Sequence, residues 1–203
     1  HSSDHSFHVM KELYGRYNHV KIITLNRNYG QQNAIKCGFE FADDFDYVVT
    51  MDDDLQHQPE ELVKIMRRMD EGYDVVYGIA AIRKHHFFRN WGSKLTDLFF
   101  TRVCHKPKNV KVGSFRCMKK SILKEIKKDQ TPFVYLTAMT LKVTKNLGFV
   151  YVDHKPRPYG RSNYSYLKRL CLFWQLYLYY SDSRPFRKLR KAQPQFIVSQ
   201  CFL

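Results

Sequence analysis

The sequence feature that most constrains the fold is an alternation of short apolar runs with amphipathic helical patterns. Three runs rich in β-branched residues occupy residues 20–25 (VKIITL), 46–51 (DYVVTM) and 74–79 (DVVYGI). Between the last two runs, apolar residues recur at helical spacing over residues 59–69, with Pro59 near the expected first turn. Strands and helices that alternate at this spacing predict βαβ units, and therefore an α/β fold with a mainly parallel sheet flanked by helices.

The second half of the chain is more basic and more aromatic than the first. Further elements are expected in four segments: a helix at residues 82–103, a short strand or turn entering a helix at 112–123, a strand at 149–156 and a helix at 166–180. We divide the chain into a domain of residues 1–165 and a basic, aromatic helix and tail of residues 166–203.

The composition is that of a globular protein, with 44% hydrophobic residues, and it excludes a disordered chain. The formal net charge of +15 favours an anionic partner: nucleic acid, a membrane surface or a phosphorylated substrate. The five cysteines form no CxxC pair, which favours reduced thiols in a cytosolic setting. No apolar run reaches the roughly 18 residues that a membrane-spanning helix needs.

Three consecutive aspartates, Asp52, Asp53 and Asp54, come directly after the second apolar run. Like charges in a row repel one another, so an acidic surface turn and a cation site are the two explanations to weigh. In open α/β sheets, ligands bind outside the carboxyl ends of the strands, which is where these aspartates are expected. We therefore favour a divalent cation that is shared with an anionic ligand.

Four motifs in order carry a resemblance to a known family: NYGQQNAIKCGFE, MDDDLQHQPEEL, GSFR and RPYGRSNY. Together they resemble the family 2 glycosyltransferases, and most of all the branch that includes dolichyl-phosphate mannosyltransferase and bacterial undecaprenyl-phosphate glycosyltransferases. The resemblance implies a nucleotide-sugar transferase fold of the GT-A type. That family usually begins with two strands that recognise the nucleotide base, of which only residues 2–4 correspond here. The resemblance therefore implies a sheet without its first strand, and weak activity for the chain as given.

The resemblance also implies roles for residues at the aspartates and in the loop before them. Asp52 and Asp54 match the two metal-binding aspartates of the family, and Gln56 matches a glutamine that helps to hold Mg²⁺ or Mn²⁺. Both ions prefer oxygen ligands, in agreement with this set. The residues implied on the donor side are Asn28, Gly30, Gln32 and Asp53. For the loop residues, turn formation at a helix start is the alternative.

Arginines supply the remaining candidates, because a guanidinium can donate two hydrogen bonds to one phosphate. Arg116 of GSFR matches a family arginine near the phosphates, and with Asp52 and Asp54 it completes the implied catalytic set. The candidates for binding the acceptor or its phosphate are Arg83, Arg89, Arg157, Arg161, Ser162 and Tyr164. The family often has an acidic residue at the position of Arg161. Solvated surface charge is the alternative for every arginine.

The implied reaction transfers a hexosyl group, with inversion, from a UDP- or GDP-sugar to a polyprenyl phosphate. The alternatives are transfer to a saccharide of a surface polymer, and a non-catalytic module that binds anionic lipid or nucleic acid. Nucleic acid is not expected, since three aspartates would repel phosphate in the absence of a metal. The aromatic helix at 166–180 has basic flanks, which suits an anionic membrane surface. We therefore expect a peripheral protein at the cytoplasmic face of a membrane.

Overall fold

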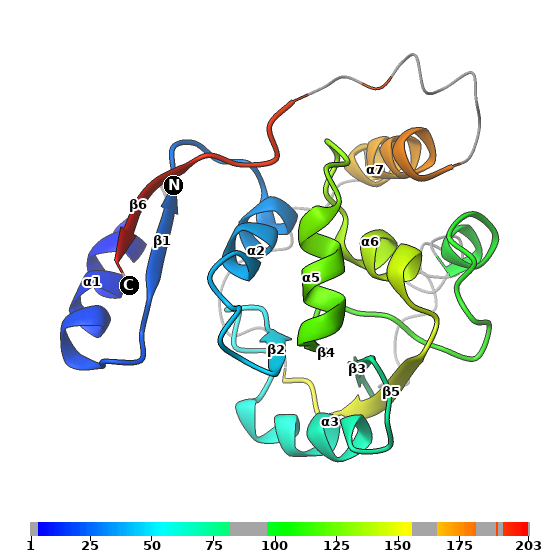
Figure 1. The fold of residues 1–203 in the computed structure, drawn as a ribbon, viewed down its shortest axis with the longest axis horizontal. Helices are drawn as coiled ribbons and strands as arrows, with labels where there is room; N and C mark the ends of the chain where they lie inside the picture. Colours follow the sequence, from blue (N-terminus) through cyan, green and yellow to red (C-terminus); the bar gives the residue numbers. More distant parts are fainter. Residues whose placement is uncertain (1–3, 82–96, 156–165, 182–189, 191–192, 203) are drawn as a thin grey trace.

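The computed structural model describes residues 4–81, 97–155, 166–181, 190 and 193–202 (Figure 1). The helices and strands of these residues are, in chain order, α1 (Ser6–Arg16), β1 (Ile22–Leu25), α2 (Gln31–Phe39), β2 (Tyr47–Thr50), the 3-10 helix η1 (Pro59–Glu61), α3 (Leu62–Met69), β3 (Val75–Ala80), β4 (Arg116–Lys119), α5 (Lys120–Lys128), α6 (Leu136–Val143), β5 (Leu147–Val152), α7 (Tyr166–Tyr180) and β6 (Val198–Phe202). Residues 97–103 are also helical.

The main sheet has four strands in the order β2-β4-β3-β5. β4 pairs antiparallel with β2 on one side and with β3 on the other, whereas β3 and β5 are parallel. Since β2 and β3 are both antiparallel to β4, the strands β2, β3 and β5 all run in the same direction. The predicted α/β fold is confirmed, and the sheet is mixed because β4 is inserted between two parallel strands.

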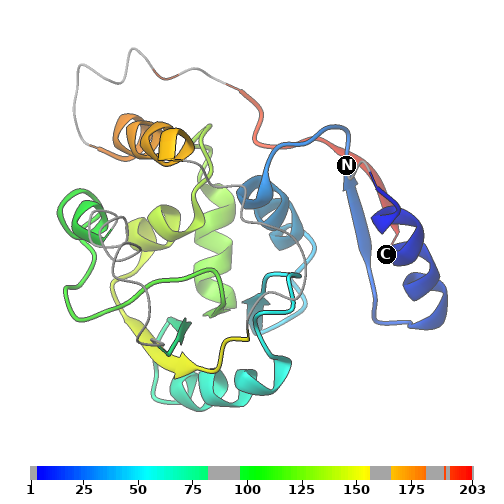
Figure 2. The same ribbon diagram turned by 180° about the vertical axis from the view of Figure 1, so that it is seen from behind.

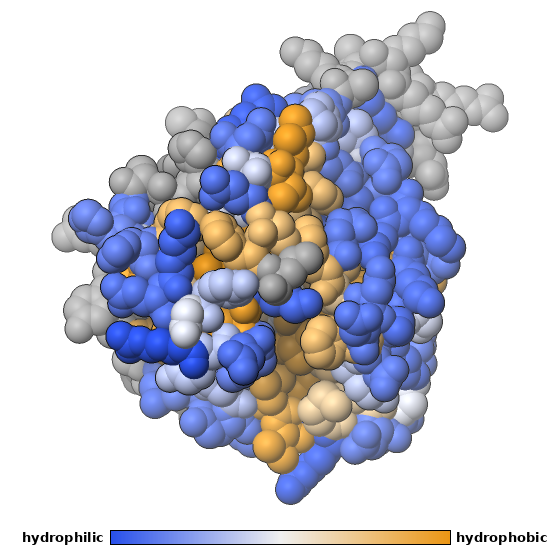
Figure 3. All heavy atoms as spheres, turned by 60° about the vertical axis from the view of Figure 1, so that its left-hand side comes forward, coloured by the Kyte–Doolittle hydropathy of each residue, from blue (hydrophilic) through white to orange (hydrophobic). Residues whose placement is uncertain are grey.

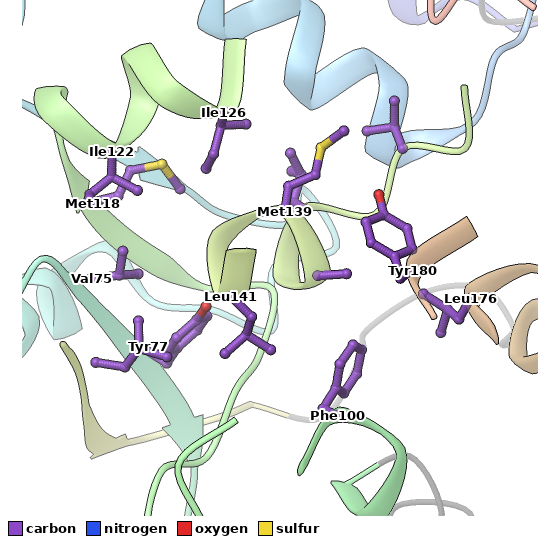
Figure 4. Close-up of a cluster of buried hydrophobic side chains, with 14 of the residues drawn as sticks. Val75, Tyr77, Phe100, Met118, Ile122, Ile126, Met139, Leu141, Leu176 and Tyr180 are labelled. Carbon is purple, nitrogen blue, oxygen red and sulfur yellow. The ribbon is translucent and has the colours of Figure 1, made fainter. Parts of the chain in front are cut away.

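Helices cover both faces of this sheet (Figures 1 and 2). Alternate residues of a strand point to opposite faces. On β3, Val75 and Tyr77 therefore join a large apolar cluster with α5, α6 and α7 (Figure 4). Val76, between them, packs with Ile65 and Met69 of α3 in a second cluster. Val75, Val76 and Tyr77 are fully buried, so β3 is covered on both faces along this stretch.

The first apolar run does not join the main sheet, which corrects our expectation of a βαβ unit across residues 20–51. Its strand, β1, pairs antiparallel with β6, with Ile22 opposite Phe202, in a separate two-stranded sheet. α1 packs on this pair through ring contacts of Phe7 and Tyr14 with Phe202. Figures 1 and 2 both show α1, β1 and β6 to one side of the main body. A β-branched run predicts a strand, but it does not indicate which other strand will pair with it.

The second apolar run forms β2, which lies at the edge of the main sheet. Its side chains alternate: Tyr47 and Val49 are exposed on one face, whereas Thr50 is buried. α3 packs on β3, β4 and β5 and leaves the outer face of β2 uncovered. The side of the molecule that carries α1, β1 and β6 shows a hollowed apolar band between two hydrophilic surfaces (Figure 3).

The last described segment of the chain is tied to α2 before it reaches β6. Gln195 is buried, and its side-chain amide donates to the backbone oxygens of Asp129 and Thr131 over 2.9 and 2.8 Å. Lys36 of α2 donates to the Gln195 side chain, and Asn33 donates to the Gln195 backbone oxygen over 2.7 Å. Burial lowers the pKa of Lys36. The chain division that we predicted at residue 165 stays a prediction.

We predict that Gly78→Ala destabilises the protein, because β3 is tightly packed at this position. A Cβ at Gly78 would lie 2.7 Å from a ring carbon of Phe115 and 3.0 Å from Cδ1 of Ile65. Overpacking of this kind costs roughly 1–3 kcal/mol of unfolding free energy, measurable by chemical denaturation. Gly15→Ala is the matched control, since nothing lies within 4 Å of its Cβ position. An unchanged stability for Gly78→Ala would contradict the packing described here.

Candidate active site

The candidate site is centred on Asp52, which lies just beyond the carboxyl end of β2. One oxygen of its carboxylate, Oδ1, accepts a hydrogen bond of 2.5 Å from Nε2 of Gln31, at the start of α2. The other oxygen, Oδ2, accepts one of 2.6 Å from Oγ of Ser114, in the segment that leads into β4. Two segments that are distant from Asp52 in sequence therefore fix the orientation of its carboxylate.

The loop after Asp52 turns sharply. Asp54 accepts a hydrogen bond of 3.2 Å from the backbone N–H of Gln56, and Asp53 is exposed. Between Asp54 and Gln56, Leu55 has a φ of 61°, a left-handed conformation that non-glycine residues seldom adopt. The Leu55 side chain is exposed, so no apolar packing offsets this conformation. Strained backbone of this kind is found most often at functional sites.

The same loop is attached to the segment after β5. His57 and His154 form an isolated antiparallel bridge. The backbone N–H of Lys155 donates to the backbone oxygen of Gln56 over 3.1 Å. The side-chain amide of Gln56 donates to the backbone oxygen of Lys155 over 3.2 Å. In addition, the backbone N–H of residue 153 donates to the carboxylate of Glu61 over 3.0 Å. The pKa of Glu61 is lowered, chiefly by its hydrogen bond from Lys64.

His57 has an unusual position within this arrangement. Its side chain is only 9% exposed, and its ring stacks on Phe115 with 4.9 Å between ring centroids. A second ring, that of His154, lies in an edge-to-face arrangement with 5.2 Å between the two ring centroids. Nδ1 of His57 is buried and has no hydrogen-bond partner among the described residues, and it lies 3.9 Å from Oδ2 of Asp52. The ring is therefore held beside the carboxylate but does not bond to it.

In the loop that we predicted to bind the donor, residues 28–32, one residue contacts the site and others stabilise the surrounding fold. Asn28 accepts a hydrogen bond of 2.8 Å from the N–H of Gly30, whose φ of 84° suits glycine at the start of α2. Gln32 accepts one of 3.0 Å from the N–H of Leu136, the first residue of α6. Gln31, between two residues that we selected, is the one that contacts Asp52. The motif NYGQQN contained it, but gave no reason to prefer it.

Arg116 is fully buried, at 1% exposure, at the start of β4. Its Nε donates to Oγ1 of Thr50 over 3.3 Å, and its guanidinium also has a long contact of 3.5 Å with Oγ1 of Thr137. The guanidinium carbon lies 5.8 Å from the ring centroid of Tyr77. Within the described part of the chain, no carboxylate forms an ion pair with Arg116. Its predicted contact with phosphate stays a prediction, whereas Ser114 of the same GSFR motif, which we did not select, contacts Asp52.

The six remaining candidates cannot be placed in the site, because they lie outside the described residues: Arg83, Arg89, Arg157, Arg161, Ser162 and Tyr164. Four of them follow Lys155 closely in sequence, and Lys155 is itself bonded to Gln56. The described chain therefore brings Lys155, two residues before the RPYGRSNY segment in sequence, to the aspartate loop. The roles that we predicted for these six residues stay predictions.

A metal ion at the aspartates would need ligands from the substrate as well as from the protein. Among the residues that the structure describes, no three His, Cys, Asp or Glu side chains gather closely enough to hold a metal ion. Mg²⁺ is, however, commonly held by one or two carboxylates together with substrate phosphates. Asp52, Asp54 and Gln56 offer oxygen ligands on one short loop, and this chemistry fits Mg²⁺ or Mn²⁺ completed by a diphosphate.

Comparison with known proteins identifies the family. Residues 1–127, more than half of the chain, match the family described as glycosyl transferase family 2. The chain belongs to glycosyl transferase family 2. Among curated members, it is similar to the undecaprenyl-phosphate 4-deoxy-4-formamido-L-arabinose transferase of Proteus mirabilis (strain HI4320), with 35% identity over 182 residues. The alignment covers 86% of the chain and 54% of that relative, so the chain spans about half of the relative's length. The similarity that we inferred to this branch of family 2 is confirmed.

We predict that Arg116→Met leaves the stability nearly unchanged, whereas Arg116→Ala lowers it. A buried charge without an anionic partner contributes little net stability, and replacing it by an apolar side chain is often neutral or stabilising. Truncation to alanine leaves a cavity, for which we expect a loss of about 2–5 kcal/mol in unfolding free energy by chemical denaturation. A loss above about 3 kcal/mol in the methionine variant would show that the guanidinium has a strong anionic partner.

Proposed function

We propose that this protein transfers a hexosyl group from a UDP- or GDP-sugar to a polyprenyl phosphate at a membrane surface, with inversion at the anomeric carbon. The observation that carries the proposal is the fixed carboxylate of Asp52 at the carboxyl end of β2, bonded to the start of α2. A helix amino terminus favours phosphate, and α2 begins at this carboxylate with Gly30 as its cap residue. A nucleoside diphosphate bridged to the aspartates by a cation suits both features.

The relative from Proteus mirabilis supports the choice of acceptor, because its name is that of an undecaprenyl-phosphate sugar transferase. The aspartate loop also lies against the segment that leads into RPYGRSNY, where two arginines could bind an acceptor phosphate. Transfer to a saccharide remains the alternative acceptor class. A test of a short prenyl phosphate against a saccharide acceptor, with the same donor, separates the two.

Mg²⁺ or Mn²⁺, if held by Asp52, Asp54 and Gln56, would stabilise the negative charge of the departing diphosphate as a Lewis acid. The protein's own part is to hold the two aspartates in place, through Gln31 and Ser114 for Asp52 and through the Gln56 N–H for Asp54. Hydrogen-bond donors that are already in place before the reaction need no rearrangement of the protein during it.

The proposed glycosyl transfer requires no proton transfer. An oxygen of the acceptor phosphate attacks the anomeric carbon from the face opposite the nucleotide. The bond between that carbon and the diphosphate oxygen breaks, and its electron pair leaves with the nucleoside diphosphate. Because the attacking oxygen is already an anion, no general base is required. A saccharide hydroxyl would require a base, and none was evident in the sequence.

α7 is the element that we propose lies at the membrane. Leu176 and Tyr180 are buried against the core, whereas Trp174 and Tyr177 are exposed on another side of the helix. Arg190 donates to the backbone oxygens of two residues near the end of α7. Its positive charge interacts favourably with the negative end of the helix dipole there. None of the helices in the described ranges is long and apolar enough to cross a bilayer. Aromatic side chains beside basic residues suit the interface, and we propose its cytoplasmic face.

The donor site is tested by calorimetric titration of UDP and GDP with and without Mn²⁺. We expect one nucleotide to bind only in the presence of Mn²⁺, and Asp54→Asn to weaken this binding by at least tenfold. Asp70→Asn, an exposed change at the end of α3, is the control and should bind as the wild type does. Metal-independent binding of RNA that weakens steeply with salt would instead favour the non-catalytic alternative.

The membrane proposal is tested by sedimentation with vesicles of phosphatidylcholine and phosphatidylglycerol. We expect Trp174→Ala to reduce the partition coefficient roughly three- to tenfold, since an aromatic side chain would leave the interface. Phe45→Ala is the control, because Phe45 is similarly exposed but belongs to the β2 side of the molecule. Equal losses in both variants, or no loss in either, would show that α7 does not make the contact.

A further inference from the structure

The buried ring of His57 has a nitrogen that the described structure leaves without a partner. Nδ1 is buried and accepts or donates no hydrogen bond, while the side chain is nine-tenths buried. A buried polar atom in this state costs free energy, so an unpartnered one calls for a functional explanation. The nearest charged atom recorded for it is Oδ2 of Asp52, 3.9 Å away. This distance is too long for a hydrogen bond, yet a shift of about 1 Å would make one.

The ring of His57 is held in place, so a hydrogen bond to Asp52 would require the carboxylate to move. Its face is stacked on Phe115 at an interplanar angle of 24°, and the ring of His154 closes another side at 72°. The backbone of His57 is paired with that of His154. The histidine is therefore held from two directions. The bond would form by a shift of the half-buried Asp52 carboxylate, and the hydrogen bonds from Gln31 and Ser114 would adjust with it.

The hydrogen bonds of Asp52 show what such a contact would achieve. A carboxylate has about four lone-pair sites, two on each oxygen. Gln31 occupies one site on Oδ1 and Ser114 occupies one on Oδ2. A bond from Nδ1–H of His57 would occupy the second site on Oδ2. The only site left would then be on Oδ1, so the carboxylate would present a single direction to a ligand.

We propose that His57 is a positioning residue, whose Nδ1–H bonds to Oδ2 of Asp52 when the nucleotide site is loaded and so fixes the lone pair that faces the ligand. This inference rests on the proposed function of the site. It goes beyond it by assigning a role to a residue that would act through Asp52. Partners of this kind typically change ligand affinity 10–100-fold when they are lost.

The test uses substitutions that separate the donor from the ring. In His57→Asn, the side-chain amide places an N–H near the position of Nδ1, but the aromatic ring is lost. In His57→Phe, the ring and its stack on Phe115 remain, but the donor is lost. His57→Gln places its N–H further out, near the position of Nε2. His8→Phe in α1 is the control, since His8 is exposed and lies outside the site.

Affinity for UDP or GDP with Mn²⁺, whichever the wild type binds, is measured by calorimetry, and folding is checked by thermal unfolding. We expect His57→Phe and His57→Gln to bind at least tenfold more weakly than wild type. We expect His57→Asn to remain within about threefold of wild type, although it is the variant that loses the stack. A purely structural role predicts the reverse order of affinities: His57→Phe would bind as the wild type does, and His57→Asn would bind more weakly. That order would overturn the proposal.

The remaining outcomes are also decisive. If His57→Phe does not fold, the comparison of asparagine with glutamine takes its place, and equal affinities of these two would overturn the proposal. If the folded wild type binds neither nucleotide, the proposed function fails, and the role of His57 fails with it. That failure is recognisable, because it appears in the wild type and not only in the His57 variants.

Discussion

The antiparallel ladder of β4 with its two neighbours is the constraint on which the rest of the structure depends. In its register, Arg116 lies opposite Thr50 of β2 and opposite Tyr77 of β3. Ser114, two residues earlier, therefore reaches the end of β2, where its hydroxyl contacts Asp52. A slip of one residue would turn every side chain of β4 to the other face of the sheet. Core packing on α3 and the geometry of the site thus depend on the same set of backbone hydrogen bonds.

Three adjacent aspartates at the end of a strand are tolerable because the fold treats each one differently. Asp52 accepts two hydrogen bonds from distant segments, Asp54 accepts one from its own loop, and Asp53 is exposed. Hydrogen bonds to a carboxylate fix its orientation. The loop is therefore held in an arrangement that suits the cation and the diphosphate that we propose. The polyprenyl phosphate that we propose as acceptor is already anionic and would need no general base.

The sequence predicted elements well and their partners poorly. β-branched runs and helical spacing located β1, β2, β3 and α3, because these signals are local. The pairing of Ile22 with Phe202 joins the two ends of the chain, and neither run contains a signal for the other. In the site, Asp52 was found from its place after a strand, but Gln31 was not, since only the folded chain shows which of two neighbouring glutamines faces it. The burial of Arg116 was missed because a motif match says nothing of solvent exposure.

The central claim is that the aspartate loop holds a nucleoside diphosphate through a divalent cation. The most direct measurement is the anomalous difference density of manganese in crystals grown with Mn²⁺ and UDP or GDP. We expect a peak within about 2.5 Å of a carboxylate oxygen of Asp52 or Asp54, with diphosphate oxygens on its other side. A nucleotide bound in the crystal with no manganese peak beside either aspartate would contradict it.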